Sequence, residues 1–307
     1  PLFQGQSAIA AFSRCPGKSQ NWVKFGFCQK NRPALPRKIR VARIKRMLPA
    51  FTSLSYIMGF ALGIAMGSFL GVVIERSNGE VCETSPRRSR CSLCKHQLSW
   101  WENIPLISFV FLRGKCRSCR SPIPYWLPLI EIAGGLAGVW LASWANQTII
   151  VITFITIIKV IGAGLIASAL IWIFFSDLVY GTVPDAAVGV GAVGAVLSHL
   201  SYLSDLSYLF AATAAAGFFL FLVLVTRGRG MGTGDVTLAA FLGFWLGWPK
   251  ILLAVWLAFI FGGVAGLILI GLKLKRFGQT IPFGPFLIAA AILALMINDN
   301  WKIMIGL

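Results

Sequence analysis

The sequence predicts an all-α polytopic membrane protein with about eight transmembrane helices and one small module outside the membrane. Hydrophobic residues make up 57% of the 307 residues, and charged residues only 12%. Soluble globular proteins contain roughly 45–50% apolar and ~25% charged residues, so this composition excludes a water-soluble enzyme and a disordered or fibrous chain. The mean hydropathy of +0.78 and repeated apolar runs of spanning length agree with a membrane protein.

The first segment, residues 1–46, is basic and irregular in pattern. It holds 11 of the 28 Lys and Arg residues and the prolines Pro16, Pro33 and Pro36, and it has no apolar run of spanning length. We interpret it as a natural basic arm, a targeting segment or a non-native extension. Met47 directly precedes the first hydrophobic run and is a plausible native start.

The first transmembrane helix is expected within residues 47–74, with its apolar run from about residue 50. Small residues recur at every fourth position of this run: Gly59, Gly63, Gly67 and Gly71. At helical spacing they form one smooth stripe, which permits close contact with another helix.

Residues 75–124 are polar and basic and form the only sizeable module predicted outside the membrane. Four cysteines in it follow the spacing C-x2-C, 21 residues, C-x2-C: Cys91, Cys94, Cys116 and Cys119. This spacing closely resembles a four-thiolate zinc site, and the alternatives are two disulfides or four unrelated thiols. His96 is not expected to be a ligand, because four thiolates complete a tetrahedron. Zinc thiolates need a reducing compartment, so this interpretation predicts a zinc-stapled cytosolic module.

The remainder, residues 125–307, is expected to be a membrane domain of about seven helices. Its candidate spans are residues 125–145, 149–176, 186–203, 206–226, 235–249, 251–272 and 281–298. By the positive-inside rule, the connections at 75–124, 177–185, 227–234 and 273–280 are cytosolic. This orientation leaves the N-terminus outside although residues 1–46 are strongly basic, and we give the internal connections more weight.

The net charge of +18 does not indicate a nucleic-acid-binding protein. Outside residues 1–46 and 75–124, the basic residues lie beside hydrophobic runs. Basic residues in such positions report membrane topology and contacts with anionic lipid headgroups. We therefore expect a lipid bilayer as the environment and no nucleic-acid partner.

Acidic residues are rare, with ten in the chain, and four of them lie in or at the ends of predicted spans: Glu131, Asp177, Asp185 and Asp235. An ionised side chain at the bilayer centre costs roughly 2.5–3.5 kcal/mol on insertion scales, so such residues are functional by default. Helix capping is the alternative for Asp185, which follows Pro184. Glu131 is expected to face the protein interior, either in a pocket or hydrogen-bonded within the bundle.

Asp177 and Asp235 form the most specific pattern. Asp177 ends the third predicted span and Asp235 begins the sixth, so the chain returns to the same membrane face between them. Gly232 and Gly234 let the backbone approach closely before Asp235. Two carboxylates that meet in a poorly solvated site share one proton. One can then act as a base on water while the other donates a proton to a scissile carbonyl.

With these residues in place, the sequence resembles the bacterial type IV prepilin peptidase family, which comprises prepilin leader peptidase/N-methyltransferases of the Gly-x-Gly-Asp type of membrane aspartic protease. The resemblance runs from about residue 47 to about residue 294. Besides the cysteine tetrad and Asp177, it rests on residues 67–70 (GSFL), 102–108 (ENIPLIS), 113–116 (RGKC), 128–131 (PLIE), 183–185 (VPD), 232–236 (GTGDV) and 282–286 (PFGPF). The turn at 282–285 either shapes the mouth of the site or begins a helix.

The resemblance implies a membrane endopeptidase that removes the short basic leader from type IV prepilins or pseudopilins at the cytosolic face of the bacterial inner membrane. It also implies methylation of the new N-terminus with S-adenosylmethionine. Asp177 and Asp235 match the family's catalytic residues, and Asp185 matches a nearby Asp with at most a supporting role. Glu131, Gly232 and Gly234 are expected to support the site.

Two other classes of function fit parts of the sequence. An ion-coupled transporter or channel explains the acidic residues within the membrane, but it assigns no task to the cysteine module. A non-enzymatic assembly protein uses that module as an adaptor, but it leaves the paired carboxylates without a role.

Overall fold

The structure is a computed structural model that describes residues 37–79, 91, 93–94, 96–148, 154–200, 205–228, 231–273 and 282–297. The chain divides into two compact units, Pro1–Arg46 and Met47–Leu307, and apart from residues 37–46 of the first helix the features below belong to the second. The helices are α1 (Arg37–Ser77), η1 (Trp100–Asn103), α2 (Ile107–Phe111), α3 (Trp126–Thr148), α4 (Phe154–Tyr180), α5 (Asp185–Ser198), α6 (Leu206–Val225), α7 (Thr233–Leu246), α8 (Lys250–Gly271) and α9 (Gly284–Met296).

The all-α membrane fold is confirmed. Within the described part of the chain, five helical stretches are long and apolar enough to cross a membrane: Ser53–Ser77, Trp126–Asn146, Ile155–Tyr180, Leu206–Val225 and Lys250–Gly271. The other three apolar helices, α5, α7 and α9, have 14, 14 and 13 residues and fall short of the ~20 residues that span a bilayer. A helix lies at each of the eight predicted positions, and the number of complete spans stays a prediction.

Several helix boundaries differ from the expected ones. The irregular pattern expected for residues 1–46 is wrong for residues 37–46, which are helical in α1, while residues 1–36 lie outside the described residues. The α4 helix continues to Tyr180, so Asp177 lies in its last turn and not beyond it. The α7 helix ends at Leu246 because Gly247 takes a φ of 71°, which glycine adopts readily.

The glycine stripe of α1 makes the close helix contact that its spacing predicts. An added Cβ at Gly59 would lie 2.6 Å from the carbonyl oxygen of Gly138 on α3. At Gly67 it would lie 2.6 Å from the carbonyl oxygen of Ile130. Any larger residue at these two positions would push α1 and α3 apart, since real side chains do not approach a backbone oxygen so closely.

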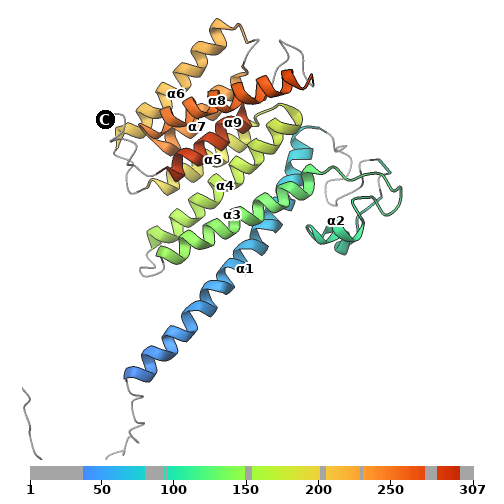
Figure 1. Cartoon of the computed structure of the whole chain (residues 1–307), viewed down its shortest axis with the longest axis vertical. Helices are drawn as coiled ribbons and strands as arrows, with labels where there is room; N and C mark the ends of the chain where they lie inside the picture. The colour runs from blue at the N-terminus through green and yellow to red at the C-terminus, as the bar shows by residue number, and fades with distance from the viewer. Residues whose placement is uncertain are drawn as a thin grey trace, which may run out of the picture. The chain divides into compact units, whose positions relative to one another are not determined.

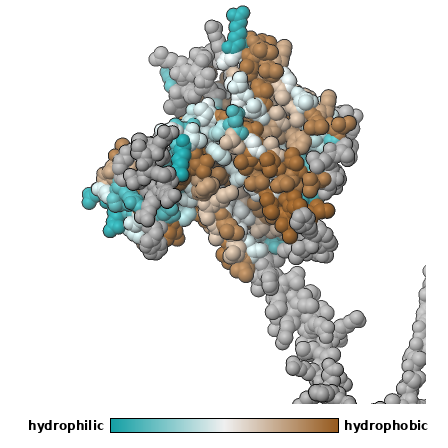
Figure 2. All heavy atoms as spheres, turned by 180° about the vertical axis from the view of Figure 1, so that it is seen from behind, coloured by the Kyte–Doolittle hydropathy of each residue, from teal (hydrophilic) through white to brown (hydrophobic). Residues whose placement is uncertain are grey.

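Helices α4 to α9 share one apolar core, and Figure 1 shows these helices running side by side. The core is centred on buried residues such as Ile173, Phe219, Leu238 and Leu287. The outer surface is also apolar: Trp256 and Leu267 of α8, for example, are 65% and 72% exposed. Figure 2 shows hydrophobic residues over much of the bundle and hydrophilic residues mainly at its margins. An apolar outer surface on apolar helices is what lipid contact requires.

Candidate active site

Asp177 lies buried in the last turn of α4, with 5% of its surface exposed. Its Oδ2 atom accepts a hydrogen bond of 2.8 Å from the backbone N–H of Gly284, the first residue of α9. The first N–H groups of a helix have no partner within the helix, so they are free to bind a carboxylate. An added Cβ at Gly284 would lie 2.5 Å from the same oxygen, so only glycine allows this approach.

Asp235 occupies the third position of α7 and is also buried, with 9% of its surface exposed. Its Oδ2 atom accepts a hydrogen bond of 3.1 Å from the backbone N–H of Gly232. The second glycine of the motif, Gly234, packs against Val183, whose Cβ would lie 2.8 Å from an added Cβ. In the Gly-x-Gly-Asp segment, Gly232 therefore supplies the backbone donor, and Gly234 needs to be glycine for its contact with the segment that follows α4.

The structure brings Asp177 and Asp235 into one region, because Phe283 and Met231, which directly precede the two backbone donors, line the same small cavity. They come from the C-terminal end of α4 and the N-terminal end of α7, and α9 contributes a donor from its own N-terminal end. Where two carboxylates in a poorly solvated site interact strongly, their ionisation belongs to the pair and not to either residue. A pair of this kind can hold one proton and one negative charge, which general acid–base chemistry requires.

A polar network joins the end of α1 to the end of α4 beside this pair. Ser176 is fully buried next to Asp177 and lies 3.3 Å from the hydroxyl of Thr182. The Thr182 hydroxyl donates to Asn78 Oδ1 at 2.9 Å, and Asn78 Nδ2 lies 3.5 Å from Ser176 Oγ. These bonds place the C-terminal end of α1 against the turn that leaves Asp177.

Asp185 and Glu131 take positions different from that of the pair. Asp185 is exposed in the first turn of α5, where a carboxylate interacts favourably with the helix dipole. Glu131 on α3 is half-buried and accepts a hydrogen bond of 2.7 Å from the backbone N–H of Leu106 in the cysteine module. A hydrogen bond also joins it to the side chain of Ser68 on α1. Glu131 therefore joins the module to the pair of helices α1 and α3.

The four cysteines converge on one point, although they come from two separate turns. All four sulfur atoms lie within 4.8 Å of one another, and none of the four is in a disulfide. Cys91 and Cys119 have their sulfurs 3.8 Å apart, and Cys94 and Cys116 have theirs 3.9 Å apart. Zinc–sulfur bonds of about 2.3 Å would place the sulfurs of a tetrahedral site roughly 3.8 Å apart. The cluster can therefore bind a metal ion, and its geometry suits tetrahedral coordination.

Short hydrogen bonds fix the backbone of each cysteine turn. The N–H of Cys91 donates to the carbonyl of His96 at 2.9 Å, and the N–H of Cys116 donates to the carbonyl of Ser121 at 2.8 Å. The hydroxyl of Ser121 lies 3.1 Å from the sulfur of Cys119, and this hydrogen bond lowers the pKa of the Cys119 thiol to about 6. A thiol with a lowered pKa is a better metal ligand, because the thiolate is the form that binds.

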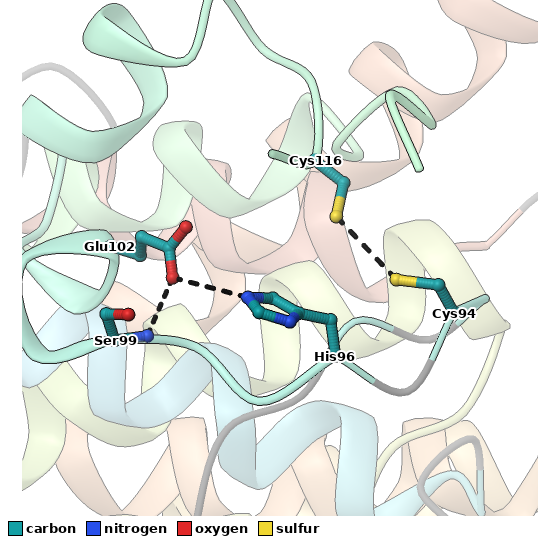
Figure 3. A network of polar contacts seen from close by, with 5 residues as sticks. All are labelled: Cys94, His96, Ser99, Glu102 and Cys116. Atoms are coloured by element: carbon teal, nitrogen blue, oxygen red, sulfur yellow. Dashed lines mark hydrogen bonds and ion pairs between the residues drawn. The ribbon is translucent and has the colours of Figure 1, made fainter. Parts of the chain in front are cut away.

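Glu102 anchors the stretch between the two cysteine turns, and Figure 3 shows its contacts. Its carboxylate accepts the N–H of Ser99 at 2.7 Å and lies 3.9 Å from Nε2 of His96. His96 thus faces Glu102 and is not a member of the sulfur cluster, as the sequence predicts. Arg117 lies over the ring of Trp101 at 5.2 Å and ties the second turn to η1.

The sequence interpretation missed the backbone donor at Gly284 and the network around Ser176. Gly284 lies within the PFGPF segment, which the interpretation assigned to a site mouth or a helix start. A helix start is confirmed, since Gly284 begins α9. The role of this helix start as a donor to Asp177 has no signal in the sequence, because it depends on a contact between segments far apart in the chain.

Comparisons with known proteins agree with this architecture. The model of the Bacterial Peptidase A24 N-terminal domain matches residues 61–145, and the model of the Type IV leader peptidase family matches residues 164–267. The first match covers three glycines of the stripe, Gly63, Gly67 and Gly71, together with the cysteine tetrad, and the second covers both paired aspartates. These matches define the class as a membrane-embedded leader peptidase.

Curated relatives extend the match over most of the chain. A protein from Stutzerimonas stutzeri named Prepilin leader peptidase/N-methyltransferase is 31% identical over 285 residues, which is 82% of this chain and 94% of that protein. A protein of the same name from Pseudomonas aeruginosa is 31% identical, covering 78% of this chain and 89% of its own length. No solved structure matches the chain. The chain belongs to the type IV leader peptidase family.

Proposed function

We propose that this protein is a membrane aspartic endopeptidase that removes the leader from type IV prepilins or pseudopilins, with Asp177 and Asp235 as its catalytic residues. The observation that carries the proposal is the buried pair of carboxylates, each held by a backbone N–H from a glycine. An ion pathway would not need either glycine donor, whereas a hydrolytic dyad needs both carboxylates held in fixed positions.

The proposed reaction uses one ionised and one protonated carboxyl group. The ionised carboxylate takes a proton from a water molecule, whose oxygen attacks the scissile carbonyl. The protonated carboxyl group donates its proton to the carbonyl oxygen, which gives a tetrahedral intermediate. The intermediate collapses as the first carboxyl group passes the proton it took from water to the leaving amine, and one hydroxyl proton of the intermediate returns to the second carboxylate. The Gly232 and Gly284 N–H groups hold one oxygen of each carboxylate, so the other oxygens remain for water and substrate.

We assign a structural zinc ion to Cys91, Cys94, Cys116 and Cys119 in the module formed by residues 75–124. The sulfur separations favour this assignment. Four thiolates fill a tetrahedral site, so the ion would hold the two cysteine turns together and leave no position for a catalytic water. The catalytic residues belong to the membrane domain formed by residues 125–307.

The substrate and location follow from the family. Prepilins and pseudopilins would lie with their apolar helix in the bacterial inner membrane and their basic leader in the cytosol, where Asp177, Asp235 and the zinc module are placed by the charge pattern of the connections. The relatives' name also supports methylation of the new N-terminus, with S-adenosylmethionine as methyl donor.

Mass spectrometry of a prepilin co-expressed with the full chain tests the proposal, because it reports the cut site and any added methyl group together. Asp177→Asn and Asp235→Asn should each lower cleavage by at least about 100-fold, the usual contribution of general acid–base catalysis. Asp205→Asn is the matched control, since Asp205 is exposed and caps α6 through Ser207. Normal cleavage by either dyad variant would refute the assignment of these residues.

A further inference from the structure

A small cavity lies beside the carboxylate pair and is lined only by apolar residues and glycines. It has a volume of about 220 Å³. Phe259, Gly262 and Gly263 of α8 form one wall. Met231 and Phe283 are in the lining too, and so is Phe286 of α9. No charged residue lines it among the described residues.

The position of this cavity is set by the same backbone that holds the dyad. Met231 directly precedes Gly232, whose N–H binds Asp235. Phe283 directly precedes Gly284, whose N–H binds Asp177. Since neighbouring Cα atoms are about 3.8 Å apart, each of these two lining residues is one step along the chain from a carboxylate donor.

We infer that this cavity is a specificity subsite that receives one large apolar side chain of the peptide held across the dyad, an inference that rests on the proposed function. An extended peptide rises about 3.3 Å per residue, so only a residue next to or near the scissile bond can reach it. A cavity of about 150 Å³ accommodates benzene, so the volume here is enough for one aromatic or long aliphatic side chain.

The walls of the cavity suit such a side chain. Phe259 and Phe283 have ring centroids 5.2 Å apart, and Phe283 also packs against the buried Phe219 at 5.8 Å. Phe283 packs against the core of the bundle, and Phe259, which is 39% exposed, stacks on Phe219 at 6.2 Å. Gly262 and Gly263 lie in the same wall as Phe259, and their lack of side chains leaves space for a substrate side chain.

Filling the cavity from α8 gives a direct test. An added Cβ at Gly262 would lie 3.6 Å from Phe283 and 3.8 Å from Phe286, in ordinary contact. Gly262→Leu should therefore occupy the cavity without displacing the backbone, and leucine favours a helix over glycine. The matched control is Gly217→Leu on α6, because Gly217 is exposed and has open space around its added Cβ.

The experiment uses the purified full-length protein and a series of prepilin peptides in which the two residues on each side of the cut are varied between alanine and phenylalanine. For the wild type, one position should favour phenylalanine by about 10- to 100-fold in kcat/KM, the value of burying one large apolar side chain. Gly262→Leu should abolish that preference at that position alone, so that the phenylalanine and alanine peptides varied there are cleaved with equal kcat/KM. Gly262→Ala should reduce the preference partially, and Gly217→Leu should not change it.

The outcomes separate this inference from the proposed function. If the wild type cleaves the series and Gly262→Leu leaves the preference unchanged, or slows every peptide equally, the cavity is not a substrate subsite. An unchanged preference would instead be the result expected if a lipid acyl chain fills the cavity. If the wild type cleaves no member of the series, the proposed function itself fails, and the inference fails with it.

Discussion

The carboxylate pair and the cysteine tetrad hold their functional side chains by opposite means. Asp177 and Asp235 are buried in apolar helices and are fixed by backbone N–H groups at helix starts. Cys94 and Cys119 are exposed, and their positions depend on two short turns that few apolar contacts support. The dyad therefore depends on helix packing, whereas the tetrad depends on its own hydrogen bonds and on the metal ion that we propose for it. A change that damages one region should leave the other intact.

The largest effect is expected at Gly284, where the packing dependence of the dyad is most direct. Gly284→Ala would place a Cβ 2.5 Å from Asp177 Oδ2, so the carboxylate must move and lose its 2.8 Å bond to the backbone. A displacement of about 1 Å in a catalytic group can cost roughly 100-fold in rate. We expect a loss of cleavage of about this size in a prepilin assay, with the metal content of the protein unchanged.

Gly189→Ala on α5 is the matched control for this change. An added Cβ at Gly189 meets nothing within 4 Å, and alanine is the better helix former. This variant should cleave normally and be at least as stable as the wild type. Wild-type activity in Gly284→Ala would show that the dyad does not need the donor from α9.

Features with a local signal could be predicted from the sequence, whereas helix ends and contacts between distant segments could not. The tetrad was predictable because its signal is local: two C-x2-C pairs bring their own turns. The pairing of Asp177 with Asp235 was predictable from the cost of placing acids in a membrane and from counting spans. The ends of α4 and α7 and the shortness of α5 were not predictable, because hydropathy measures apolar length and not the turn that stops a helix. The contact of Gly284 with Asp177 depends on packing alone.

Removing one sulfur ligand should disrupt the cysteine tetrad and leave the helical bundle intact. Cys116→Ser replaces a thiolate ligand by a hydroxyl group, which binds zinc poorly, so metal bound per protein should fall from about one to near zero. The cysteine turns should then open and become accessible to protease between residues 91 and 125, while the helical content of the bundle stays the same. Elemental analysis and limited proteolysis measure these two effects.

Cys82→Ser is the control for the cysteine change, since it makes the same substitution outside the tetrad. Its metal content should equal that of the wild type. If Cys116→Ser retains a full equivalent of zinc, the four-thiolate assignment is wrong. A loss of helical content in Cys116→Ser would instead show that the folding of the helical bundle depends on the cysteine tetrad.

The smallest effect is expected where the two regions meet, at the hydrogen bond from Leu106 to Glu131. Leu106 has a positive φ of 59°, an unusual conformation for leucine, and its N–H donates to the Glu131 carboxylate at 2.7 Å. Removing this acceptor leaves the N–H without its partner, at a cost of about 1–3 kcal/mol. In Glu131→Ala, the amide of Leu106 should therefore exchange its hydrogen roughly 10- to 100-fold faster.

Glu131→Gln sharpens this test, because an amide oxygen can still accept the N–H of Leu106 while the charge is lost. We expect its exchange rate to stay closer to that of the wild type, and the amide of Cys116, bonded to Ser121, to be unaffected in both variants. If Glu131→Gln and Glu131→Ala increase the hydrogen exchange rate of the Leu106 amide equally, the charge of Glu131 matters more than its hydrogen bond. If neither variant does so, the cysteine module is held to the membrane helices by contacts other than Glu131.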